Sequence, residues 1–159
     1  MTASPDLARP DPVAAPAPSL RTERRAPRAL LVEDEPVVGE LLAEFLELEG
    51  YEVDRAREGG QALELVRRHV YTLIVSDVRM PDVDGPAFYY QLRAVRPELA
   101  RRMVFVTGDI TNADTRRFLD ETCLRYLEKP FTIAQFQTVV QGVLAEFPVP
   151  DGGAPSAPA

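Results

Sequence analysis

Three acidic residues that could do chemistry follow two short apolar runs of the sequence. Glu33 and Asp34 come directly after the run 29–32, and Asp77 comes directly after the run 72–76. Carboxylates that lie close together are unfavourable unless a cation neutralises them. Their oxygens suit Mg²⁺, which keeps several of its waters in protein sites. The alternative reading is that these acids only cap the helices that follow.

Two further polar residues follow other apolar runs. Thr107 comes after the run 103–106, and Lys129 comes shortly after the run 124–127. Lys129 is the only lysine in a chain that otherwise uses arginine for positive charge. An ammonium is a compact point charge on a flexible stem, so it binds phosphate differently from arginine. The pattern favours a phosphate contact at Lys129, and chance loss of lysine elsewhere is the alternative.

The segments that must position these residues alternate between two types. Short apolar runs predict strands at 29–32, 51–56, 72–76, 103–106 and 124–127, and helical periodicity predicts helices at 36–49, 60–68, 85–96, 112–121 and 133–147. Pro36 suits the first turn of a helix, and Thr132 with Gln135 forms a capping box before the last one. Alternating strands and helices predict an α/β fold with a parallel, doubly wound sheet. Ligands bind such sheets at the carboxyl ends of the strands, where all five polar residues are expected to meet.

Composition and charge limit the number of domains and the kinds of partner. The 159 residues are 45% hydrophobic and carry a net charge of −7. This size suits one domain, which we expect at 28–147, between disordered proline- and alanine-rich tails at 1–27 and 148–159. The negative charge disfavours nucleic acid and anionic membranes as partners. Too few residues follow the domain for a DNA-binding output domain, so we expect no direct contact with nucleic acid.

Cysteine usage and hydropathy bear on the location of the protein. A single cysteine, Cys123, allows no disulfide within the chain, and we expect it to be a small buried residue. No apolar run approaches the roughly 20 residues of a membrane helix. The first 27 residues do not have the pattern of a signal peptide. These features predict a cytoplasmic protein that does not contact membranes.

Four segments resemble the motifs of bacterial two-component response-regulator receiver domains. They are Leu31-Val32-Glu33-Asp34-Glu35-Pro36, Asp77-Val78-Arg79-Met80-Pro81-Asp82-Val83-Asp84-Gly85, Val106-Thr107-Gly108 and Tyr126-Leu127-Glu128-Lys129-Pro130-Phe131. The resemblance spans 28–147 in the family's order and spacing. It implies a chemotaxis-regulator-like, flavodoxin-like (β/α)5 fold with strand order 2-1-3-4-5. It also implies a signalling domain rather than an enzyme. The segments around Thr107 and Lys129 are similar to receivers attached to hybrid histidine kinases.

The resemblance implies a role for each polar residue at the sheet edge. Asp77 would accept a phosphoryl group from a phosphohistidine on a histidine kinase or a histidine phosphotransfer protein. Lys129 and the hydroxyl of Thr107 would contact the phosphoryl oxygens. Mg²⁺ would be held by Glu33, Asp34, Asp77 and the backbone carbonyl of Arg79. Lys129-Pro130 would be a cis peptide.

The resemblance also implies a conformational switch. Thr107 would move toward the phosphoryl group, and Tyr126 would fill the space that it leaves. The face formed by the segments 112–121, 124–127 and 133–147 would then change, to control a downstream protein or to pass the phosphoryl group on. A static, half-buried aromatic is the alternative for Tyr126. Arg79 and Asp109 flank the pocket, where they could set the lifetime of the phosphorylated state or be solvated loop charges.

Three other classes of protein use similar residues. An aspartate-nucleophile hydrolase of the haloacid-dehalogenase type would need Asp-x-Asp, but Arg79 and Pro36 stand two residues after Asp77 and Asp34. A flavodoxin-like cofactor carrier would have strand-end loops rich in Ser, Thr and Gly. A degenerate receiver would act as a constitutive binding module. Whether the chain is free-standing or part of a hybrid kinase stays open at this point.

Overall fold

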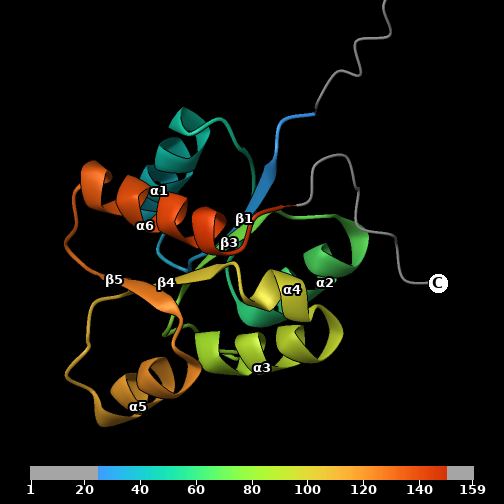
Figure 1. Ribbon diagram of the computed structural model, residues 1–159. Helices are drawn as coiled ribbons and strands as arrows, with labels where there is room; N and C mark the ends of the chain where they lie inside the picture. Colours follow the sequence, from blue (N-terminus) through green and yellow to red (C-terminus); the bar gives the residue numbers. More distant parts are fainter. Residues whose placement is uncertain (1–24, 150–159) are drawn as a thin grey trace, which may run out of the picture.

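The computed structural model describes residues 25–149, which form a five-stranded parallel sheet with helices on both faces (Figure 1). The strands are β1 (Arg28–Val32), β2 (Glu52–Ala56), β3 (Leu73–Asp77), β4 (Met103–Thr107) and β5 (Arg125–Glu128). Their order in the sheet is β2-β1-β3-β4-β5, and every pair is parallel. The predicted fold class and strand order are confirmed. Most of the predicted tails, 1–24 and 150–159, lies outside the described residues.

Six helices cover the sheet within the described residues. They are α1 (Pro36–Leu48), α2 (Gly59–Arg68), α3 (Gly85–Val95), α4 (Pro97–Ala100), α5 (Ala113–Thr122) and α6 (Ile133–Glu146). Figure 1 shows α1 and α6 on one face and the other four on the opposite face. The short helix α4 was not predicted. Pro97 ends α3 as expected, but it also begins a new turn, because proline is tolerated at the first helical position. No helix in 25–149 is long and apolar enough to cross a membrane.

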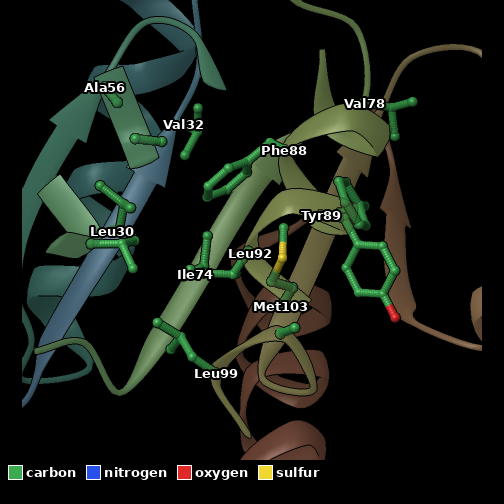
Figure 2. Close-up of a cluster of buried hydrophobic side chains, with 14 of the residues drawn as sticks. Leu30, Val32, Ala56, Ile74, Val78, Phe88, Tyr89, Leu92, Leu99 and Met103 are labelled. Carbon is green, nitrogen blue, oxygen red and sulfur yellow. The ribbon is translucent and has the colours of Figure 1, made fainter. Parts of the chain in front are cut away.

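Two apolar layers hold the helices on the sheet. Side chains of a strand alternate between its faces, so the in-register row Leu30, Ile74 and Met103 points to one layer. There it meets Phe88 and Leu92 of α3, as Figure 2 shows. The alternate strand residues meet α1 and α6 in the second layer. Burying each large side chain contributes roughly 1.5–3 kcal/mol, so both faces stabilise the sheet.

Local signals set the ends of several elements. The capping box before α6 is present: the Gln135 N–H donates to Thr132 Oγ1 over 3.2 Å, and the Thr132 N–H donates to Gln135 Oε1 over 2.9 Å. Lys129-Pro130 is a cis peptide. Cys123 is exposed, contrary to the prediction, because it ends α5 in a left-handed conformation with a φ of 53°.

Candidate functional site

The carboxyl edge of the sheet brings the predicted acidic residues together. Val32 is in register with Ser76 on β3, so the residues that follow β1 lie beside the end of β3. Oxygens of Glu33, Asp34 and Asp77 all lie within 4.8 Å of one another. Glu33 and Asp77 are buried, with 3% and 8% of their surface exposed. Asp77 is the last residue of β3 rather than the first residue after it, and this rigid strand therefore carries the central carboxylate.

Lys129 faces the same cluster from the loop after β5. Its Nζ donates to Asp77 Oδ2 over 3.2 Å and to Glu33 Oε2 over 3.1 Å. The backbone N–H of Lys129 donates to the carbonyl of Thr107 over 2.8 Å, which ties this loop to the end of β4. One ammonium thus bridges two buried carboxylates at the ends of two different strands, β1 and β3.

The site carries more negative than positive charge. Burial raises the pKa of Glu33, and the negative charge of Asp77 raises it further. Burial alone would lower the pKa of Lys129, but the charges of Asp77 and Glu33 outweigh it and raise the pKa. Both shifts follow from carboxylates crowded in a place with little water. A divalent cation would relieve this excess charge, so the donor set fits the predicted Mg²⁺.

The packing of the start of α3 against the end of β3 depends on Gly85, for which the sequence predicted no role. A Cβ at Gly85 would lie 2.5 Å from the carbonyl oxygen of Asp77 and 2.9 Å from the ring of Phe105. The Gly85 N–H donates to the carbonyl of Val78 over 2.9 Å. The start of α3 can therefore lie against the end of β3 only if this residue has no side chain. The dipeptide Asp84-Gly85, a common turn signal, was the clue in the sequence.

Thr107, Arg79 and Asp109 lie around the acidic cluster. Thr107 is buried, and its hydroxyl accepts a hydrogen bond from the Asp109 N–H over 3.2 Å. The guanidinium of Arg79 lies 3.6 Å from a carboxylate oxygen of Asp109, and the backbone N–H of Arg79 donates to Asp77 Oδ1 over 3.1 Å. A hydrogen bond from the Thr111 hydroxyl lowers the pKa of Asp109. The charges of Arg79 and Asp109 therefore pair beside Asp77 and Thr107.

Tyr126 stands apart from these residues. It is in register with Phe105 on β4, whereas Thr107, two residues further along β4, is in register with Glu128. Its side chain is 38% exposed. No hydrogen bond joins it to Thr107 in the part of the chain that the structure describes. The structure thus brings together Glu33, Asp34, Asp77, Lys129 and Thr107, and leaves Tyr126 at a neighbouring position.

A doubly wound sheet with buried carboxylates and an ammonium at its carboxyl edge is the arrangement expected of a phosphoacceptor signalling domain. The family model for the response regulator receiver domain matches residues 29–141. The response regulator Rre1 of Synechocystis is 34% identical over 117 residues, which are 73% of this chain and 51% of that protein. The sensor kinase CckA of Brucella abortus is 35% identical over 117 residues, which are 72% of this chain and 12% of the kinase.

A solved structure shares both the fold and the sequence pattern. The receiver domain of the sensor histidine kinase PA1611 from Pseudomonas aeruginosa PAO1 is 30% identical and superposes with a TM-score of 0.67, covering 76% of this chain and 98% of that domain. It holds a magnesium ion coordinated in its active site cleft.

The chain belongs to the response regulator receiver domain family. It is a module of two-component phosphorelay signalling and not a hydrolase or a cofactor carrier. It spans about half the length of Rre1 and a much smaller share of CckA. The predicted likeness to receivers of sensor kinases agrees with two of these comparisons.

Proposed function

We propose that Asp77 accepts a phosphoryl group from a phosphohistidine, and that residues 28–147 are the unit that does so. The observation that carries this proposal is the bridge from Lys129 to Asp77 and Glu33, at 3.2 and 3.1 Å. It places a positive charge beside the carboxylate that would receive the phosphoryl group. Phosphoryl transfer needs little from a protein beyond such positioning and charge.

The residues of the site have separate tasks in the proposed transfer. A carboxylate oxygen of Asp77 attacks phosphorus, the new O–P bond forms, and the P–N bond to the imidazole of the donor breaks. Lys129 Nζ donates to a phosphoryl oxygen in place of one of its present carboxylate partners. The Thr107 hydroxyl, which is buried beside the strand end, donates to another phosphoryl oxygen. The imidazole leaves with the electron pair of the broken bond and takes up a proton.

The proposed metal ligands are three carboxylates and one backbone group. They are the side chains of Glu33, Asp34 and Asp77 and the carbonyl of Arg79. Bound Mg²⁺ would neutralise negative charge on the carboxylates and on the phosphoryl oxygens. The mutual approach of the three carboxylates, within 4.8 Å, supports this assignment.

The partner that we propose is a histidine kinase or a histidine phosphotransfer protein. The start of α1, directly after the acidic pair, presents Val37 and Leu41 to solvent, with 78% and 46% of their surfaces exposed. An apolar surface beside the site suits a partner that brings its phosphohistidine to Asp77. Because such kinases use ATP of the cytosol, we propose a cytoplasmic location.

The proposed output is a change in the face formed by α5, β5 and α6. Thr107 would turn toward the phosphoryl group, and the partly exposed Tyr126 would move inward. That face would then bind a downstream protein, or the phosphoryl group would pass onward.

The test is intact mass after incubation with acetyl phosphate and Mg²⁺. Wild type is expected to gain one phosphoryl group, about 80 Da, because we propose Asp77 as the single phosphoacceptor of the two buried carboxylates that Lys129 contacts. Asp77→Asn is expected to gain none. Asp82→Asn is the matched control, since Asp82 lies in the same loop, is exposed, and has a φ of 62° that asparagine tolerates.

The outcomes separate a working receiver from a degenerate one. Loss of the adduct on removal of Mg²⁺ would support the metal assignment. No adduct in wild type, together with no change in the protein on addition of beryllofluoride, would contradict the phosphoacceptor proposal and favour a constitutive binding module.

A further inference from the structure

Helices α2 and α3 leave a groove between their carboxyl-terminal halves. Its apolar lining comes from Leu63 and Val66 of α2 and from Ala94 and Val95 of α3, and it encloses about 710 Å³. Val95 is 64% exposed, which is unusual for a large apolar side chain beside a hollow. The groove therefore exposes apolar surface to water, and covering this surface would be favourable.

The surroundings of the groove are basic in a chain that is acidic as a whole. Residues 59–68 and 85–96 carry four arginines, Arg67, Arg68, Arg93 and Arg96, and a single acid, Glu64. One carboxylate oxygen of Glu64 lies 2.9 Å from the guanidinium of Arg67, and the other lies 3.6 Å from the guanidinium of Arg68, so this acid pairs with both arginines. Within residues 25–149, no carboxylate lies within 4.0 Å of Arg93 or Arg96. Of the two arginines that line the groove, Arg67 pairs with Glu64 and Arg96 keeps its positive charge available, although the whole chain carries −7.

The groove is remote from the phosphorylation site. Helix α3 begins at Gly85, next to the carbonyl of Asp77, and runs for 11 residues. At 1.5 Å per residue, Val95 lies roughly 15 Å away along the helix. The groove is therefore separate from the carboxyl edge, where we propose that a kinase binds.

We propose that this groove binds an amphipathic helix of a partner protein, with acidic side chains on either side of an apolar stripe. The apolar lining would take the stripe, as in other helix-in-groove complexes. Arg67 and Arg96, on opposite walls, would pair with the acidic side chains. A nucleic acid would match the arginines but would leave the apolar lining unused, and the net charge of the chain would oppose it.

The test uses a labelled synthetic peptide that forms an amphipathic helix of leucines and glutamates. Fluorescence anisotropy is expected to show saturable binding, and amide chemical shifts are expected to change at 62–69 and 91–97. Replacing both Arg67 and Arg96 by glutamate is expected to weaken binding about tenfold, since two favourable charge contacts become repulsive. Arg57→Glu is the matched control, because Arg57 is exposed and lies outside the groove.

A second variant keeps the proposal testable if the double replacement unfolds. Val95→Asp alters an exposed residue of the lining, and it is expected to weaken the same peptide without changing phosphorylation by acetyl phosphate. Peptide binding by both variants is measured without phosphorylation. The results can therefore be interpreted even if the proposed phosphoacceptor site fails.

Four results would overturn the proposal. The first is equal binding of a scrambled peptide of the same composition, and the second is shift changes outside the groove. The third is tighter binding at the groove by single-stranded DNA or by phosphatidylglycerol vesicles, which would assign it to another class of partner. If the arginines only offset the dipoles of α2 and α3, the glutamate variants would lose stability but keep their peptide affinity, which also contradicts the proposal.

Discussion

Lys129 contacts two buried carboxylates because the side chains of Lys129 and Glu33 are both long enough to meet. Its flexible stem lets the ammonium lie between Asp77 and Glu33. Glu33 has one methylene more than an aspartate would have. One of its oxygens meets Lys129, and the other accepts a hydrogen bond from the Glu35 N–H over 3.1 Å. A glutamate here thus joins the lysine to the start of α1.

Lys129→Met is expected to destabilise the domain in the absence of Mg²⁺. Two buried carboxylates would lose a charged donor, at a cost of about 1–3 kcal/mol in the free energy of unfolding. Urea unfolding with and without Mg²⁺ measures this change. Addition of Mg²⁺ is expected to stabilise the variant more than wild type, because the cation takes over part of the charge that Lys129 supplied. An equal effect of Mg²⁺ on both proteins would contradict this account.

The ion pair between Arg79 and Asp109 is expected to slow loss of the phosphoryl group. Both side chains are exposed and their charges lie 3.6 Å apart, so the pair is a weak one that solvent screens. Replacing either residue by alanine should therefore speed dephosphorylation only modestly, by a few-fold at most. The decay of phosphorylated protein, followed by intact mass, measures the rate. The double variant should be no faster than the single ones, and additive effects would mean that the two residues act separately.

At the scale of elements, the site depends on how closely α3 approaches the end of β3. The N-terminus of α3 is capped by Asp84, whose side chain accepts a hydrogen bond from the Ala87 N–H over 2.9 Å. The next residue, Gly85, touches the backbone of Asp77. Any shift of this helix start would therefore move the carboxylate that we propose as phosphoacceptor.

Gly85→Ala is expected to destabilise the domain by about 1–3 kcal/mol, the usual cost of overpacking. The new methyl group would meet the Asp77 carbonyl and the Phe105 ring, neither of which can move freely. Thermal unfolding measures the loss. Gly108→Ala is the control, because a Cβ there would meet nothing within 4 Å. Similar melting temperatures for the two variants would show that α3 can shift without cost.

At the scale of the whole molecule, each apolar layer contains a buried tyrosine. Tyr51 belongs to the layer under α1 and α6, and Tyr71 belongs to the layer under α2 and α3. Burial raises the pKa of Tyr51 to about 12. Burial also raises the pKa of Tyr71, whose hydroxyl donates to Asp54 over 2.7 Å. The folded state therefore favours the protonated form of both.

This preference predicts a loss of stability in alkali. A pKa that folding raises contributes stability below the unfolded value, near 10, and this contribution is lost as pH rises through the folded value. For Tyr51 the window is from about 10 to about 12. Urea unfolding at several pH values should show a smaller loss over this window for Tyr51→Phe and Tyr71→Phe. Tyr90→Phe, at an exposed site, should behave like wild type.

The sequence predicted the elements because apolar periodicity and capping signals are local. All five strands, five of the helices and the capping box at Thr132 lie within a residue or two of their predicted places. The acidic cluster could also be predicted, since parallel strands must end at one edge of the sheet. The order of the strands came from resemblance to a family, because periodicity does not say which strands are neighbours.

Only the tertiary structure decided the contacts between distant segments. Lys129 and Glu33 are 96 residues apart, and their pairing depends on how β5 and β1 are placed in the sheet. The close approach at Gly85, the exposure of Cys123 and the groove between α2 and α3 likewise depend on packing between elements. Local sequence specifies which residues form a strand or a helix, whereas burial and side-chain contacts arise only when those elements meet in three dimensions.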